Sequence, residues 1–174
     1  MTNAVNLAAV GSKANSGGTL ITSGTAVAST SGTNIDFTSI PSWVKRITVM
    51  FSGVSTSGAN AILIQLGTSG GVDATGYVGA GSTITSAGAA GTTAYTTGFG
   101  LRKVNAVDTR GGAVTISTLG SNAWTASGVS NPDGSSLDFV AGYKTLSGTL
   151  DRIRITTSGG TDTFDAGTIN ILYE

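Results

Sequence analysis

The sequence contains neither histidine nor cysteine among its 174 residues, and this absence decides most of the chemistry that the chain could perform. Ser-His-Asp triads, Cys-His pairs and the common zinc sites all require one of these two residue types. General acid–base chemistry would fall to Asp, Lys, Tyr or the single glutamate, Glu174. We therefore expect no enzyme, and in particular no polysaccharide depolymerase.

The carboxylates are scattered along the chain. A glycosidase needs two of them about 5–10 Å apart. Asp138 and Asp151 open expected strands, and we expect them at the surface or in turns. Asp commonly accepts hydrogen bonds from nearby backbone N–H groups in turns. Four others lie in turn-like sequence: Asp73, Asp133, Asp162 and Asp165.

Metal and cofactor motifs are also missing. Residues 161–167 could offer two carboxylates and several carbonyls to Ca²⁺, but their spacing matches no established calcium loop. The glycines that flank Ala80 and Phe99 lack the strand–turn–helix context of a dinucleotide fingerprint. We predict no metal and no cofactor.

Three aromatic residues are the candidates for ligand binding. Trp124 lies among small residues, where an indole could stack on a sugar ring. We interpret the Gly-, Ser- and Thr-rich segment 67–98 as two long loops around a weak strand. Tyr77 and Tyr95 lie within this segment and frame the loops. Loops on a rigid scaffold commonly carry binding residues. We predict Trp124, Tyr95 and Tyr77 as receptor contacts; the alternative, that they are core or interface aromatics, stays open.

The charge composition limits the partners. Lys and Arg number nine, as do Asp and Glu, and only 10% of residues are charged. Nucleic-acid binding depends on clustered Lys and Arg, and anionic membranes attract basic segments, so neither partner is expected. A chain with little net charge is suited to packing beside copies of itself. No apolar stretch of about 20 residues predicts a membrane span, and residues 1–10 lack the features of a signal peptide.

Alternating side chains predict strands. In segment 44–53, Ile47, Val49 and Phe51 share one face, as a half-buried strand requires. In segment 151–157, Ile153 and Ile155 alternate with arginines. A turn at 31–33 suggests a hairpin between 25–30 and 34–37. Further strands are expected at 61–66, 76–84, 95–104, 114–119, 124–129, 137–146 and 168–173.

Short strands at regular spacing without helices predict an all-β fold. We expect an antiparallel β-sandwich, jelly-roll-like, formed by residues 25–174. An immunoglobulin-like sandwich would usually show a Cys…Trp…Cys spacing, which is absent. Residues 1–24 are poor in large apolar side chains and are expected to form a short N-terminal extended arm that docks on another chain. Its apolar residues are the expected virion anchor: Leu7, Val10 and Leu20.

Several apolar side chains fall on the faces expected to be solvated. A half-exposed sheet should carry polar groups there, and contiguous exposed apolar patches usually mark interfaces. We predict a homo-oligomer, with a trimer favoured. Its expected subunit interface comprises Met50, Leu63, Leu119 and Leu172.

Two segments carry a family resemblance. Residues 35–49 with 51–55, and residues 164–174, resemble segments of small tail, fibre and other virion proteins of tailed bacteriophages. The resemblance implies a β-sandwich structural protein of the virion, made in the host cytoplasm without a signal peptide, with other virion proteins as partners. It implies no catalytic residue. We expect a tail-fibre or tail-associated module that contacts the host surface, with glycan as the receptor. A capsid decoration or head-fibre protein, anchored to the shell by its N-terminal arm, is the alternative.

Overall fold

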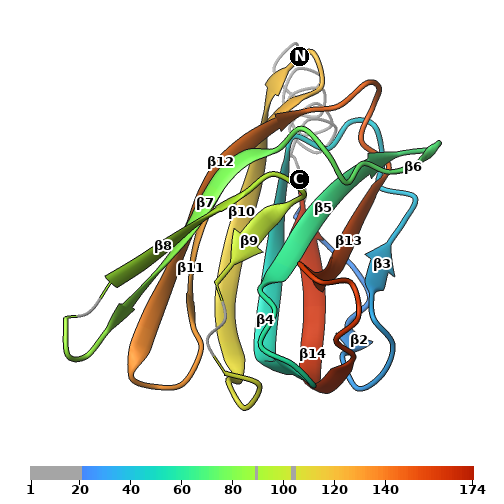
Figure 1. Ribbon diagram of the computed structural model, residues 1–174. Coiled ribbons are helices and arrows are strands. Elements are labelled where there is room, and N and C mark those ends of the chain that lie inside the picture. Colours follow the sequence, from blue (N-terminus) through green and yellow to red (C-terminus); the bar gives the residue numbers. More distant parts are fainter. Residues whose placement is uncertain (1–20, 89, 103–104) are drawn as a thin grey trace, which may run out of the picture.

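The computed structural model describes residues 21–88, 90–102 and 105–174. These ranges form fourteen strands and no helix, and the strands make two antiparallel sheets packed face to face (Figure 1). The expected antiparallel β-sandwich is therefore confirmed. Because the described ranges contain no helix, none of them offers a long apolar helix that could cross a membrane.

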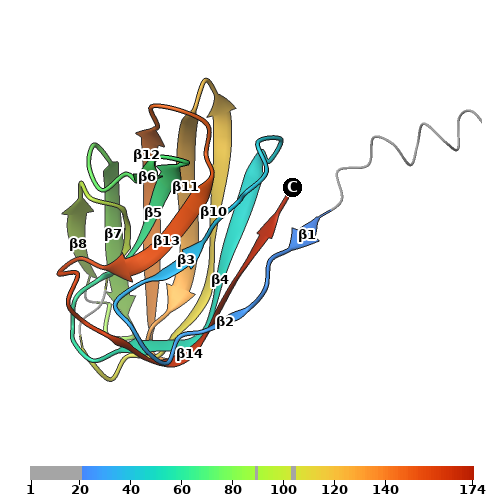
Figure 2. The same ribbon diagram turned by 90° about the vertical axis from the view of Figure 1, so that its right-hand side faces the viewer.

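The larger sheet has nine strands. Its order is β1 (Thr22–Ser23), β14 (Phe164–Tyr173), β4 (Arg46–Thr56), β10 (Arg110–Gly120), β11 (Ala123–Asn131), β12 (Ser136–Thr145), β7 (Val78–Thr85) and β8 (Ala90–Tyr95), and β2 (Val27–Ala28) also pairs with β14. Strands β10, β11 and β12 form a meander of consecutive hairpins. Figure 2 shows β8 at one end of this sheet and β1 at the opposite end.

The smaller sheet has five strands. Its order is β3 (Ile35–Phe37), β13 (Arg152–Thr157), β5 (Ile62–Thr68) and β6 (Gly71–Val72), with β9 (Phe99–Leu101) also paired to β5. The chain crosses repeatedly between the sheets, at β2–β3, β3–β4, β4–β5, β6–β7, β8–β9, β9–β10, β12–β13 and β13–β14. Such crossings give the fold its jelly-roll-like character, because strands far apart in sequence become neighbours.

The core lies between the inward faces of the two sheets. Ile47 and Val49 of β4 face Ile153 and Ile155 of β13 across it, and all four are fully buried. Each side chain of this size contributes roughly 1.5–3 kcal/mol of burial free energy. The alternation predicted for segments 44–53 and 151–157 is therefore the alternation that closes the sandwich.

Segment 67–98 corrects one expectation. It was expected to form two long loops around a weak strand, yet it contains β6, β7 and β8. Glycines make the segment look irregular, but they are needed where strands pack closely. A Cβ atom on Gly81 would lie 2.3 Å from the carbonyl oxygen of Gly100. Glycine in a strand thus marks close backbone approach rather than a loop.

The expected hairpin around residues 31–33 is also wrong. Strand β2 pairs with β14 of the larger sheet, whereas β3 pairs with β13 of the smaller one. The turn therefore carries the chain from one sheet to the other. The boundary expected between the arm and the sandwich differs slightly, because Thr22–Ser23 already pairs with the end of β14. The proposed anchor residues Leu7, Val10 and Leu20 lie outside the described residues.

Candidate binding surfaces

The predicted receptor contacts Tyr77 and Tyr95 are buried side chains, which corrects their interpretation as loop aromatics. The Tyr77 hydroxyl accepts a hydrogen bond from the Leu66 N–H (2.6 Å) and donates one to the Asp73 carbonyl oxygen (2.9 Å). Its ring packs edge-on against Phe99 at 5.1 Å between centroids. Tyr95 packs against Ala61 and Leu63. Neither ring offers a free face to a sugar.

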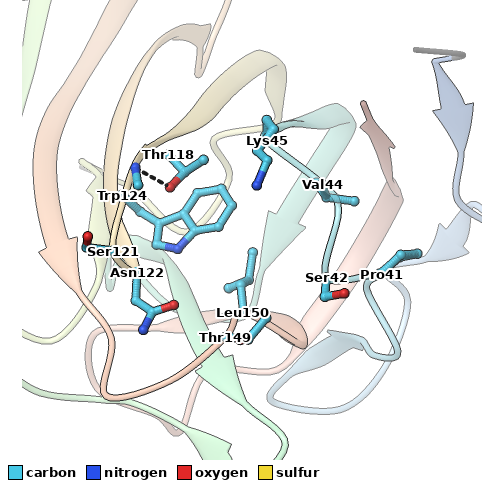
Figure 3. A pocket seen from close by; sticks show the side chains of 11 residues that line it. Pro41, Ser42, Val44, Lys45, Thr118, Ser121, Asn122, Trp124, Thr149 and Leu150 are labelled. Atoms are coloured by element: carbon cyan, nitrogen blue, oxygen red, sulfur yellow. Dashed lines mark hydrogen bonds between the residues drawn. The ribbon is translucent and has the colours of Figure 1, made fainter. Parts of the chain in front are cut away.

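Trp124 is also buried, with 5% of its surface exposed, so it offers no broad face for stacking at the molecular surface. It differs from the two tyrosines because it lines a pocket. We call this the hairpin pocket, and its lining includes Lys45, Ser121, Asn122, Trp124, Thr149 and Leu150 (Figure 3). The prediction that Trp124 stacks on a receptor at the surface is therefore wrong. Contact between Trp124 and a ligand inside the pocket stays a prediction.

Three of the four residues predicted at a subunit interface share one surface. Met50 of β4 and Leu172 of β14 point away from the smaller sheet, because their neighbours along each strand point into the core. Leu119, at the bulged end of β10, continues the outward alternation of that strand and is exposed. Leu63 does not belong with them. It lies on the smaller sheet, 1% exposed, and Tyr95 of the same chain covers it. Its place in a subunit interface is therefore wrong.

We call the outward side of the larger sheet the outer face. Its strands are in register, so one continuous row runs Ser82, Phe139, Val129, Ala113, Met50 and Asn170. None of the outward residues of β7, β10, β11 and β12 is charged. Its exposed large apolar side chains are Val78, Ile84, Leu119, Val129, Leu137, Phe139 and Tyr143.

A shallow apolar depression marks the middle of the outer face. It has a volume of about 530 Å³ and lies over β7, β11 and β12, with Ala80, Val129 and Phe139 in its lining. Apolar patches of this kind on a protein surface usually mark sites of contact with another molecule. The sequence pointed to this face through Met50, Leu119 and Leu172, but missed Val129 and Phe139, its central residues.

The outward side of the smaller sheet has the opposite character. Arg154 forms a two-pronged ion pair with Asp36, with both nitrogen–oxygen distances at 2.7 Å. Arg152 pairs with Asp151 at 2.9 Å. The two outward sides of the sandwich therefore differ in charge. The smaller sheet carries these ion pairs, whereas the larger sheet carries apolar and small hydroxyl side chains over β7, β10, β11 and β12, and the ion pair of Arg46 with Glu174 lies at the end of β4.

The aspartates considered for metal binding have structural partners. Asp162 accepts hydrogen bonds from the backbone N–H and the side-chain amide of Asn60, at 3.0 and 2.9 Å. Asp165 accepts one from the Ser55 hydroxyl. Across the described ranges, no group of three or more metal-ligating side chains comes together.

The fold and its surfaces define an antiparallel β-sandwich in which one outward side carries ion pairs and the other is uncharged and apolar over β7, β10, β11 and β12. No protein-family model matches the chain, and neither a curated protein nor a solved structure matches it.

Proposed function

We propose that the chain is a structural, non-enzymatic component of a tailed-bacteriophage particle, in which copies of the sandwich associate through the outer face. The observation that carries the proposal is the lack of charge on the outward residues of β7, β10, β11 and β12, together with the seven exposed apolar side chains among them. A monomer with only 10% charged residues has few means of keeping such a face in water. Burying it against other copies removes that apolar surface from solvent.

The self-association is the part of the proposal that comes from the surface itself. The row through Phe139, Val129 and Met50 is uncharged, so a second copy meets no unpaired charge when it packs there. Burying an unpaired charge at an interface is costly. The ion pairs of Arg152 and Arg154 remain on the solvated side of the assembly.

Among particle positions we propose a tail-fibre or tail-associated module that contacts the host surface. The sequence resemblance of residues 35–55 and 164–174 supports a virion role. The alternative is a capsid decoration or head-fibre protein held by its N-terminal arm. One feature favours that alternative: β1 is the outermost strand of the larger sheet beyond β14, so the chain enters the fold at a free edge (Figure 2).

The location is tested by immuno-electron microscopy of particles purified from the source culture, with an antibody raised against the purified chain. Label at the tail in a few copies supports the fibre role. Label over the whole shell overturns that role in favour of decoration. Particles that lack the chain by both labelling and mass spectrometry overturn the virion role altogether.

The association is tested by light scattering at micromolar concentration. We expect an oligomer, with three copies favoured, and we expect the double substitution Val129→Lys with Phe139→Lys to yield monomers. Val107→Lys is the matched control, because Val107 is 84% exposed in a loop outside the sheets. A wild-type monomer, or a double variant that still associates, overturns the proposed interface.

A further inference from the structure

The hairpin pocket lies where the β10–β11 turn meets the segments that precede β4 and β13 (Figure 3). Its volume is about 210 Å³. The turn between the paired residues Gly120 and Ala123 contains only Ser121 and Asn122, whose φ angles are 50° and 61°. Two consecutive positive φ angles define a type I′ turn, which matches the twist of a hairpin. The tight turn therefore fixes one wall of the pocket.

A buried donor without a partner lies at this pocket. Trp124 Nε1 has no contact with solvent and no hydrogen-bond partner. A buried Trp N–H usually finds an acceptor, and leaving one unsatisfied costs about 1–3 kcal/mol. Figure 3 shows the indole nitrogen pointing between Asn122 and Leu150, both of which line the pocket. The missing acceptor therefore belongs on the pocket side of the ring.

Several other polar side chains of the pocket also lack a partner within the described residues, although the Thr118 hydroxyl has two, the Ala123 carbonyl oxygen and the Gly120 N–H. Lys45 is its one charged lining residue, and its ammonium makes no ion pair with any residue that the structure describes. Within the same described ranges, the hydroxyls of Ser42, Ser121 and Thr149 make no hydrogen bond. No carboxylate lines the pocket. A site rich in donors, with one cation and no anion, is complementary to an oxygen-rich anionic ligand.

The size of the pocket narrows the class of ligand. Pockets for drug-sized molecules measure about 300–1,000 Å³, so this one suits a smaller group, such as a single six-membered ring. Hydroxyl groups on the walls suit a hydroxylated ring, and Lys45 suits a carboxylate on it. The backbone carbonyl of Asn122 accepts a hydrogen bond from the Leu146 N–H at 3.0 Å and makes none with the indole, whose nitrogen has no partner.

We propose that the hairpin pocket binds one carboxylated sugar unit of the hexuronate type, with a ligand oxygen accepting the Trp124 N–H and Lys45 pairing with the carboxylate. Because the indole nitrogen makes no contact with solvent, one of the side chains that flank it, Asn122 or Leu150, turns aside when the ligand enters. The inference deepens the proposed function, in which the chain contacts the host surface. It rests on that function only in naming the source of the sugar, which is an acidic host glycan.

The test follows the Trp124 indole N–H by nuclear magnetic resonance in ¹⁵N-labelled protein. Trp43→Phe removes the other indole, since Trp43 lies outside the pocket lining and half of it is exposed. We expect D-glucuronate to shift the Trp124 indole proton saturably and downfield at millimolar concentration. D-glucose should bind more weakly. Lys45→Met should weaken glucuronate binding up to about fivefold, the effect of one partly exposed ion pair, and leave glucose binding unchanged.

Three outcomes overturn the inference. One is an indole resonance that no sugar moves. Another is glucuronate binding that is equally strong in Trp124→Phe, which places the ligand elsewhere. A third is an indole shift caused by Asn122→Ala in the free protein without any response to sugar, which makes the Asn122 side chain the partner. The test uses purified protein and free sugar. If the protein does not respond to sugar, the proposed location in the particle is unaffected. If the chain is absent from particles, a sugar response of the purified protein still stands.

Discussion

Arg110 and Asp138 form an ion pair in which neither side chain is exposed beyond 1%. Arg110 also donates to the Ser130 hydroxyl (2.7 Å) and to the Arg102 carbonyl oxygen (2.6 Å), and Thr83 donates to the second Asp138 oxygen (2.6 Å). Thr83, Arg110, Ser130 and Asp138 come from β7, β10, β11 and β12 respectively. The pair therefore ties together the four strands whose opposite sides form most of the outer face.

Asp138→Ala should lower the free energy of unfolding by about 3–5 kcal/mol, because it leaves a buried guanidinium without its counter-charge. The measurement is urea denaturation followed by circular dichroism. Asp36→Ala is the control. This substitution removes the partner of Arg154 in an ion pair whose two side chains are about one third exposed. It should lower the free energy of unfolding by no more than about 1 kcal/mol. Equal losses in the two variants would contradict a specific role for the buried pair.

The buried pair shows what the sequence could not reveal. We expected Asp138 at the surface or in a turn, since an isolated aspartate in an alternating strand gives no sign of which face is inward. Its partner Arg110 lies 28 residues away and becomes its neighbour only through the register of β10, β11 and β12. Segments with strong local alternation, such as 44–53 and 151–157, were predictable because burial repeats within one strand.

The same reasoning explains the candidate site. Met50, Leu119 and Leu172 could be assigned outward from their own strands, so part of the outer face was predicted. Tyr77 and Tyr95 were misplaced because neighbouring glycines look like loop sequence, yet at Tyr95 the missing glycine side chain makes room for the ring. A Cβ atom on Gly100 would lie 2.2 Å from the Tyr95 ring. Trp124 was selected for its surroundings in the sequence, but its unpartnered N–H is visible only in three dimensions.

Tyr77→Phe should lower stability at neutral pH by about 1–3 kcal/mol, because the buried Leu66 N–H loses its acceptor. Burial also raises the pKa of the Tyr77 hydroxyl above its usual value near 10. A folded-state pKa above the unfolded one means that stability is complete below about pH 10 and declines as the pH rises further. Urea midpoints at pH 8 and pH 11 should therefore differ less in Tyr77→Phe than in wild type.

Tyr143→Phe serves as the control for the alkaline experiment. Tyr143 lies on the outer face with 55% of its surface exposed, so its removal should leave the wild-type difference between pH 8 and pH 11 in place. An alkaline loss that Tyr77→Phe does not reduce would show that other groups cause it.

Gly100→Ala should destabilise the fold by about 1–3 kcal/mol, the usual cost of overpacking a core. The added methyl would overlap the Tyr95 ring, which packs against Leu63 and Ala61. Gly111→Ala is the matched strand control, because no atom lies within 4 Å of its added Cβ. Thermal denaturation of the two variants checks the prediction, and a melting temperature unchanged by Gly100→Ala would contradict the packing.

Ser121→Gly should raise the free energy of unfolding by up to about 1 kcal/mol, since Ser121 holds a left-handed φ of 50° that glycine adopts without steric cost. Ser127→Gly, in the extended part of the same strand pair, should instead lower it by about 0.5–1 kcal/mol. Opposite signs in urea denaturation would place the strain in the turn. Ser121 lines the hairpin pocket. A gain in stability in Ser121→Gly would therefore show that the strained turn lowers the stability of the wild-type fold. Such backbone strain is common where the backbone shapes a binding site.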